Sequence, residues 1–545
     1  MTSTDKVWAE ATSHLSRDFA TGLNTAVETC ERWAGNRAKL ALVIRHADGG
    51  RETWTYYELA RESARLSEVL RRTGLVRGDR VAGVLSRQRE AWLTSLAAWR
   101  AGIVYVPIFT GFGADAVAQR LSEGKVKTVV VDYQSREVVH AALSKISEDI
   151  AVISVAGPRG EGLHRGDWSY WSEVDRIVGT NEATPTGASE PATLMFTSGT
   201  TNTPKGCLIP HSGFVSLIPF VRGVLDLRPS DLLFSTSDPG WSYGLYTTGV
   251  VPMALGYPRL VYTGDFSPRD WLTVIAKEDA SFVAGAPSAF RGLARYAARN
   301  GLAASVRGAT CAGEALDDDT VNAWEALGQG PLLDGYGLTE VGMVLANLSN
   351  PPIAATPGTL AGPVPGFEVD LYDPEGRQVG EGGTGQIVVQ RPPFQLSSGY
   401  DNEPDAWEAR WRDDWFLTGD LGRRDESGRW HYVGREDDVI ITSGYNVGPA
   451  EVESVLLQHS GVAEAAVVAQ ADPERGSVVR AVIVPSPGAP SEDVLTKQLQ
   501  ESVRLRVGRH AYPRVVDFVD SLPRTATGKI RRAALRNTSP PRSRP

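Results

Sequence analysis

Four groups of polar residues lie far apart along this 545-residue chain, and each has a composition suited to a nucleotide or its phosphates. The first, Thr197–Gly206, reads Thr-Ser-Gly-Thr-Thr-Asn-Thr-Pro-Lys-Gly and follows the apolar stretch Thr193–Phe196. Backbone N–H groups and hydroxyls donate to phosphate oxygens, glycine permits close approach, and the lysine supplies positive charge. The pattern departs from a Walker loop, because Pro-Lys-Gly stands where Gly-Lys-Ser/Thr is required. Alone, it predicts either a phosphate-binding loop or a turn after a strand.

The second group, Asp334–Glu340, follows a pair of leucines and reads Asp-Gly-Tyr-Gly-Leu-Thr-Glu. Tyr336 stands between two glycines, so nothing bulky beside it prevents its ring from lying against a flat base. Thr339 and Glu340 supply a hydroxyl and a carboxylate, which are ligand types for Mg²⁺ and phosphate. The competing interpretation is a turn with a surface glutamate.

The other two groups are weaker when read alone. Asp420, within Thr418-Gly-Asp420, could accept both hydroxyls of a ribose, although aspartate in a glycine turn is common. Lys529 lies in the basic stretch Arg524–Arg532 beside a glycine. It is either a lysine delivered to a distant anionic site or part of a solvated basic end.

Length and composition restrict the class of protein. A chain of 545 residues exceeds what one core usually supports, so we expect at least two domains. The net charge of −9, without a long basic run before the C-terminal end, excludes a nucleic-acid surface. Cys30, Cys207 and Cys311 are isolated, which argues against disulfides and a cysteine metal site and favours the cytoplasm. We expect no signal peptide and no membrane span.

Short apolar runs alternate with amphipathic stretches in the first 310 residues. This alternation predicts βαβ units and a mostly parallel sheet. The expected strands are 40–44, 80–85, 103–107, 128–132, 232–236, 259–262, 282–286 and 305–310, and the helices include 57–72, 89–101 and 114–123.

Two later segments differ from this pattern. Residues 367–390 have glycine-rich turns and predict a small antiparallel unit. Beyond residue 438 we expect a compact α+β unit with helices at 449–458 and 491–507 and strands at 462–470, 478–484 and 515–519. The predicted fold is therefore α/β, with a large N-terminal domain (1–436), a small mobile α+β C-terminal domain (437–536) and a disordered tail (537–545).

Together and in this order, the motifs resemble the acyl-adenylate-forming superfamily of acyl-CoA synthetases, nonribosomal adenylation domains and luciferases. The resemblance extends from about residue 25 to 535 and includes Cys311–Glu314 and Gly434–Asp438. Ser237–Trp241 and Thr442–Glu453 most resemble the acetyl-CoA and medium-chain acyl-CoA synthetases.

The resemblance implies a role for each motif. ATP or AMP would be bound by Thr197, Ser198, Gly199, Thr200, Thr201, Lys205, Gly313, Glu314, Asp334, Gly335, Tyr336, Thr339, Asp420 and Arg435. Lys529, Thr339 and Glu340 would be catalytic, and Glu340 would also hold Mg²⁺. Asp437 would be the hinge between the domains, and coenzyme A would meet Gly444 and Tyr445.

The chain departs from the family at two positions. Asn202 replaces a glycine of the signature loop, and asparagine tolerates left-handed backbone better than most residues. Asn446 replaces an arginine that is common in close relatives. These changes bear on nucleotide affinity and thiol handling, not on the class of enzyme.

The resemblance also locates an acyl pocket. Its wall would include Trp241, Gly244, Leu245, Gly285, Ala286 and Gly337. Acetate-specific relatives carry tryptophan at the position of Gly337, so a deeper pocket is implied here. Asp238 could pair with a substrate amine, but membership of the Ser-Asp-Pro-Gly-Trp turn is the favoured interpretation.

The expected function is ATP-dependent ligation of a medium-chain, branched or aromatic monocarboxylate to coenzyme A through an acyl-adenylate. One alternative is a freestanding adenylating enzyme that loads a carrier protein. Another is a noncatalytic nucleotide- or acyl-binding protein, against which Lys205, Glu340, Asp420 and Lys529 argue. The sequence does not fix the oligomeric state, and a homodimer is compatible with it.

Overall fold

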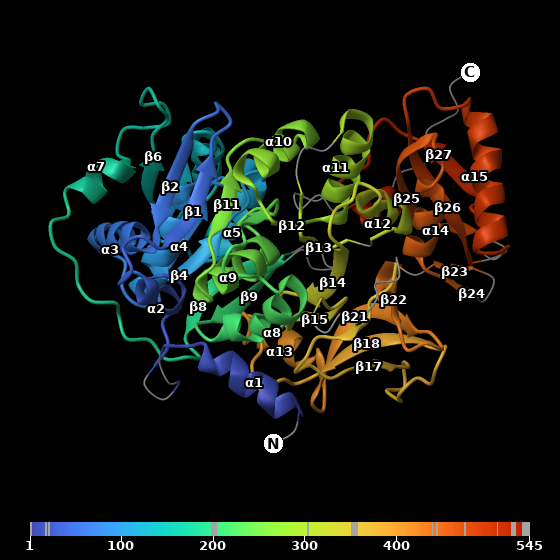
Figure 1. Ribbon diagram of the computed structural model, residues 1–545, viewed down its shortest axis with the longest axis horizontal. Coiled ribbons are helices and arrows are strands. Elements are labelled where there is room, and N and C mark those ends of the chain that lie inside the picture. The colour runs from blue at the N-terminus through green and yellow to red at the C-terminus, as the bar shows by residue number, and fades with distance from the viewer. Residues whose placement is uncertain are drawn as a thin grey trace.

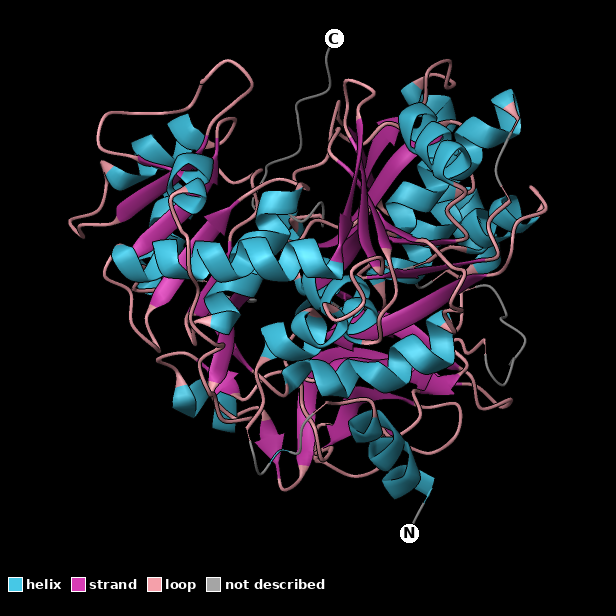
Figure 2. Ribbon diagram, turned by 60° about the vertical axis from the view of Figure 1, so that its left-hand side comes forward, coloured by secondary structure: helices cyan, strands magenta, loops and turns pink. Residues whose placement is uncertain are grey.

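The computed structural model describes residues 3–16, 19, 22–197, 204–301, 305–314, 316–349, 358–438, 440–442, 445–472, 476–509, 511–524 and 530–536. Two large sheets form most of the protein, and a smaller red and orange unit lies at the C-terminal end (Figure 1). Helices cover the strands, as Figure 2 shows.

The first large sheet carries the strand that leads into the hydroxyl-rich motif. Its order is β19 (Gly399–Tyr400), β9 (Lys205–Pro210), β8 (Pro191–Thr197), β4 (Val104–Pro107), β3 (Arg80–Val84), β5 (Thr128–Asp132), β6 (Ala151–Val155) and β7 (Trp168–Ser169). The pairs from β8 through β4, β3, β5 and β6 to β7 are parallel, whereas β9 pairs antiparallel with both β8 and β19. Continuous apolar runs such as Thr128–Asp132 are buried along their whole length, as covered parallel strands require.

The second large sheet carries the motif with Tyr336 and Glu340. Its order is β16 (Gly362–Pro363), β15 (Gly342–Ala346), β14 (Leu332–Leu338), β13 (Gly308–Ala312), β12 (Phe282–Gly285), β10 (Leu233–Ser235), β11 (Arg259–Tyr262), β1 (Leu40–Arg45) and β2 (Arg51–Thr55). The pairs from β14 to β1 are parallel, and antiparallel strands close both edges.

Amphipathic helices surround both sheets. In α3, Thr55 and Glu58 form a capping box that fixes where the helix begins. The helices are α1 (Ser3–Ser13), α2 (Thr25–Thr29), α3 (Tyr56–Arg72), α4 (Arg89–Arg100), α5 (Ala114–Glu123), α6 (Arg136–Leu143), α7 (Tyr170–Asp175), α8 (Ile218–Phe220), α9 (Val251–Ala254), α10 (Pro268–Glu278), α11 (Pro287–Asn300), α12 (Asp318–Glu325) and α13 (Pro404–Glu408). Short 3₁₀ and π turns include η3 (Gly213–Leu217), η5 (Tyr243–Val250) and η6 (Glu436–Asp438).

A five-stranded antiparallel sheet follows, as the glycine-rich turns predicted. It contains β17 (Val369–Tyr372), β18 (Thr384–Gln390), β20 (Trp411–Arg412), β21 (Trp415–Arg424) and β22 (Trp430–Arg435). Strands β21 and β22 pair so that Asp420 lies opposite Arg435.

The C-terminal unit has its own apolar core, which includes Val467, Ile483 and Leu499. It comprises β23 (Ile440–Thr442), β24 (Tyr445–Val447), α14 (Pro449–Leu457), β25 (Val462–Asp472), β26 (Gly476–Pro485), α15 (Glu492–Arg506), β27 (Val515–Phe518) and α16 (Arg532–Arg536). Helix α14 packs beside β22, which joins this unit to the rest of the chain.

The predicted α/β class and the small C-terminal α+β unit are confirmed. None of the helices in the described part of the chain is long and apolar enough to cross a bilayer. The tail that we expected beyond residue 536 lies outside the described residues.

Candidate active site

Asp420 and Tyr336 lie 84 positions apart in sequence, but their side chains touch. The Tyr336 hydroxyl donates to Asp420 Oδ2 at 2.7 Å, and Arg435 Nε lies 3.3 Å from Asp420 Oδ1. The Tyr432 ring packs against the Tyr336 ring in a tilted arrangement, with centroids 5.9 Å apart, and its hydroxyl donates to Asp420 Oδ1 at 3.5 Å. The arrangement combines an aromatic face for a base with a carboxylate for sugar hydroxyls.

The backbone that presents Asp420 within β21 depends on glycine. Gly419 has φ = +72°, a left-handed conformation that side-chain-bearing residues rarely adopt. The Thr418 hydroxyl accepts the Asp420 backbone N–H at 3.1 Å and donates to the Ile387 carbonyl at 2.6 Å. The Thr-Gly-Asp sequence therefore fixes the backbone position from which the Asp420 carboxylate extends.

Glu340 lies at the far end of the Asp334–Glu340 motif, beside strand β9. The Tyr400 hydroxyl donates to Glu340 Oε1 at 2.8 Å, and the Lys205 ammonium lies 5.0 Å from the centre of the Tyr400 ring. Glu340 is buried and makes no ion pair with any residue that the structure describes. A buried carboxylate with one donor and no countercharge fits a divalent cation.

A short segment around Ser397 holds these groups together. The Ser397 hydroxyl donates to the Thr339 carbonyl at 2.7 Å, and its N–H donates to the Glu340 carbonyl at 3.1 Å. The N–H of Asp401 donates to the Gly206 carbonyl at 2.7 Å, so the same segment also reaches β9. It thereby links the end of the Tyr336 motif to the end of the hydroxyl-rich motif.

Removal of the Tyr400 hydroxyl should weaken binding of the magnesium-bound nucleotide. We expect Tyr400→Phe to raise the KM for MgATP by roughly tenfold, because a hydrogen bond to a charged group contributes about 1.5–3 kcal/mol. Titration with Mg²⁺ at fixed ATP measures the effect. Tyr372→Phe, in the antiparallel sheet, is the matched control, and an equal change in both variants would contradict the assignment.

Asp334 begins the same motif and accepts the N–H of Gly335 at 2.9 Å and the Cys311 thiol at 3.7 Å. Burial raises the pKa of the Asp334 carboxyl to about 7, although these two hydrogen bonds oppose the shift. The folded protein therefore holds a proton there that the unfolded chain releases near pH 4.

This shift predicts a pH dependence of stability. The folded state binds more protons than the unfolded state between about pH 4 and about pH 7, so the free energy of unfolding should fall as the pH rises through that window. Asp334→Asn should flatten this part of the profile. Thermal midpoints from about pH 4.5 to 7.5 test it; parallel profiles of the two proteins would contradict it.

The predicted acyl wall is rich in aromatic and small residues. The Trp241 ring packs 5.5 Å from Phe109 and 5.8 Å from Phe112. A Cβ at Gly337 would overlap the Gly342 carbonyl, and one at Gly285 would overlap the Thr236 hydroxyl. These glycines therefore let neighbouring atoms approach closely. A tryptophan at Gly337 would disturb the pairing of β14 with β15 instead of simply capping a pocket.

Gly313 and Glu314 directly follow β13, beside α11. The Glu314 carboxylate accepts from the Ser288 N–H at 3.2 Å and from its hydroxyl at 3.3 Å. Ser288 lies two residues after Ala286, so Glu314 is near the expected acyl wall. The Glu314 carboxylate also stabilises the first turn of α11.

The two ends of the hydroxyl-rich motif are described, but several other predicted residues are not. Thr197 and Lys205 are the ends of paired strands, and the Thr197 hydroxyl donates to the Lys205 carbonyl at 3.3 Å. Outside the described residues lie Ser198, Gly199, Thr200, Thr201, Asn202, Gly444 and Lys529; the side chains of Asp437, Tyr445 and Asn446 are also not described. Their assigned roles stay predictions.

The sequence analysis missed Tyr400, Ser397 and Tyr432. Tyr400 and Ser397 belong to Gln395-Leu-Ser-Ser-Gly-Tyr400, which contains no pattern that indicates a ligand. They become relevant only because β19 pairs with β9. Tyr432 lies three residues before Arg435, and it becomes relevant only because β22 pairs with β21.

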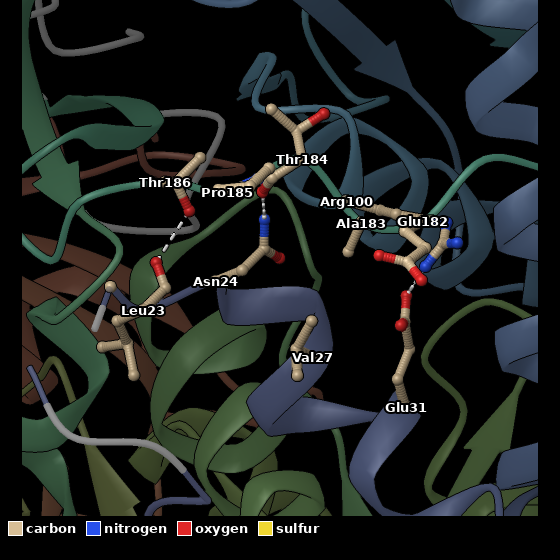
Figure 3. Close-up of a pocket in the computed structure, with 11 residues that line it drawn as sticks. Leu23, Asn24, Val27, Glu31, Arg100, Glu182, Ala183, Thr184, Pro185 and Thr186 are labelled. Carbon is tan, nitrogen blue, oxygen red and sulfur yellow. Dashed lines mark hydrogen bonds and ion pairs between the residues drawn. The ribbon is translucent and has the colours of Figure 1, made fainter.

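A cavity of about 340 Å³ lies apart from these groups (Figure 3). Asn24, on the approach to α2, donates to the Thr184 carbonyl at 3.2 Å, and Arg100 pairs with Glu31 across the other end. None of the candidate residues named above lines it. We therefore assign the site from the side-chain contacts, not from cavity size.

Comparison with known proteins identifies related chains over most of the length. The profile described as AMP-binding enzyme matches residues 30–401, and that described as AMP-binding enzyme C-terminal domain matches residues 451–529. The rat mitochondrial acyl-coenzyme A synthetase ACSM4 is 32% identical over 97% of this chain and 92% of its own length. The acetyl-coenzyme A synthetase of Bacillus subtilis is 31% identical over 97% and 93%, respectively.

Solved structures agree with these relatives. A benzoate CoA ligase from Burkholderia xenovorans superposes with a TM-score of 0.83 at 27% identity, covering 94% of this chain and 100% of that one. The segment matched by the AMP-binding enzyme profile, residues 30–401, contains Tyr336 and both partners of the Glu340–Tyr400 contact.

Proposed function

We propose an activity for this chain from one premise: it belongs to the AMP-binding enzyme family. It is an AMP-forming ligase of the acyl-CoA synthetase type, and such enzymes use ATP, Mg²⁺ and coenzyme A. The proposal concerns the acid that it activates and the residues that do so.

The observation that carries the assignment of the site is the convergence of distant motifs. Tyr336 and Asp420 meet at 2.7 Å, and Glu340 meets Tyr400 beside Lys205. The first pair is suited to an adenosine, and the second lies at the opposite end of the same strand and loop. A nucleoside triphosphate with its base at Tyr336 and its ribose at Asp420 would extend toward Glu340 and Lys205, so its phosphates would lie near these two residues.

The first half-reaction requires a carboxylate to attack the α-phosphate, which brings two anions together. We assign Lys205 and the signature loop to the departing pyrophosphate, and Lys529 to the carboxylate and α-phosphate. Glu340 would hold Mg²⁺, which supplies positive charge to the phosphates, and Thr339 would touch the α-phosphate. Positioning and charge neutralisation are the main contributions that the protein makes to such a transfer.

The second half-reaction requires the opposite arrangement, because the acyl-adenylate must become accessible to a thiol. We propose that residues 437–536 form a mobile domain that turns at Asp437, removing Lys529 and presenting Gly444 and Tyr445. The separate apolar core beyond residue 440 supports a unit that can move as one body.

The three buried, unpaired cysteines support the cytoplasm as the compartment.

We propose that the acid is a medium-chain, branched or aromatic monocarboxylate. Support comes from the apolar ring cluster around Trp241. The relatives include enzymes named for acyl groups, acetate and benzoate, so the class of acid needs a direct test.

A carboxylate panel tests this assignment. Acid-dependent pyrophosphate release should give the highest kcat/KM with acids of about six to ten carbons or with a ring, because each buried CH₂ contributes about 0.8 kcal/mol. The highest kcat/KM with acetate would contradict the proposal. Mass spectrometry of products with coenzyme A against a carrier protein as acceptor separates the CoA ligase from the less favoured carrier-loading activity.

A further inference from the structure

Arg259 is a buried cation without a countercharge. It begins β11, and its side chain is only 3% exposed. Neither Nε nor Nη1 has a hydrogen-bond partner, and no carboxylate among the described residues forms an ion pair with it. Its guanidinium stacks on the Trp92 ring at 4.5 Å, which is a weak replacement for an anion.

This arrangement is costly for a protein alone. Burial lowers the pKa of Arg259 to about 9, so the side chain still carries its charge at neutral pH. An unpaired buried charge destabilises a fold by several kcal/mol unless a partner compensates it. Arg136, which is also 3% exposed, shows the usual solution, because Nε and Nη2 each contact Asp167 at 2.8 Å.

A small cavity lies beside Arg259. Its volume of about 10 Å³ admits one water-sized group. Arg87 also lines it and donates to the Thr236 carbonyl at 3.2 Å and the Gly264 carbonyl at 2.8 Å. The other polar residues in the wall are Ser235 and Ser237, and none of the lining residues carries a carboxylate.

We propose that this cavity binds one free halide ion beside Arg259. The ion would supply the missing negative charge and accept from the guanidinium N–H groups of Arg259 that have no partner.

The test of this proposal does not depend on catalysis. Thermal midpoints are compared in sodium chloride and sodium gluconate of equal ionic strength, for the wild type, Arg259→Met and Arg136→Met. We expect chloride to raise the wild-type midpoint by at least about 2 °C. Arg259→Met should abolish that rise without lowering the midpoint in gluconate. Arg136→Met should lower the midpoint in both salts and keep the chloride response.

The outcomes decide the proposal. A chloride response that depends on Arg259 supports a bound halide. A response that persists in Arg259→Met, or its absence from the wild type, overturns the anion site, while the carboxylate panel can still support the proposed function. If Arg259→Met does not fold, wild-type crystals grown with bromide decide: no bromide density beside Arg259 overturns the proposal.

Discussion

Lys529→Ala should lose the first half-reaction and keep the second. We expect acid-dependent pyrophosphate release to fall by about 100- to 1000-fold, the scale for removing one preorganised group that stabilises developing charge. Conversion of a supplied acyl-adenylate with coenzyme A should stay near the wild-type rate, because in our account the lysine has left by then.

The fold gives a reason to expect a localised effect. An antiparallel bridge between Arg524 and Ile530 brackets the segment that carries Lys529. Beyond it, Arg532 Nη2 contacts Glu453 Oε2 at 2.7 Å, which anchors α16 on the C-terminal unit. Both flanks of the segment are therefore fixed by groups other than Lys529.

The matched control for Lys529→Ala is Arg531→Ala, which removes an exposed cation two positions away. It should change neither half-reaction by more than about twofold, because isolated surface charges contribute little. Single-turnover assays of each half-reaction measure both variants. Equal losses of Lys529→Ala in the two halves would refute the division of labour.

Asp420→Ala should raise the KM for ATP by roughly tenfold to a hundredfold. The loss removes a charged acceptor of two ribose hydroxyls, each hydrogen bond to a charged group being worth about 1.5–3 kcal/mol. It also leaves Arg435 and the Tyr336 hydroxyl without their present partner. Asp420→Asn keeps the shape and should lie between Ala and wild type.

A control in the same hairpin separates binding from folding. Asp425 accepts the N–H of Ser427 at 2.9 Å in the turn between β21 and β22 and does not touch Tyr336. Asp425→Ala should lower the thermal midpoint slightly and leave the KM for ATP unchanged. The assignment of Asp420 to the ribose would be wrong if the two variants altered the KM equally.

The sequence predicted the elements well where patterns are local. The apolar run Thr128–Asp132 and the amphipathic stretch Ala114–Glu123 match a strand and a helix with the same bounds. Both signals depend on periodicity within a few residues. The antiparallel pairing of β8 with β9 was not predicted, because it depends on which strand lies at the edge of a sheet.

The prediction of the site was limited in the same way, because only residues in local motifs could be identified. Tyr336, Glu340 and Asp420 were identifiable because each lies in a short motif, and the contact of Tyr336 with Asp420 agrees with one nucleotide site. Tyr400 was not identifiable, because its contact with Glu340 depends on the pairing of β19 with β9. Arg259 was missed because a strand residue gives no local sign of an absent countercharge.

The fate of a carboxylate oxygen tests the central claim most directly. In the proposed reaction, a carboxylate oxygen bonds to the α-phosphorus as pyrophosphate leaves, and the thiol later breaks the acyl carbon–oxygen bond. An acid labelled with ¹⁸O in both carboxylate oxygens should therefore give AMP that carries one ¹⁸O and acyl-CoA that carries one. Mass spectrometry of the AMP measures this transfer; AMP without the label, or ADP as the product, would contradict the account.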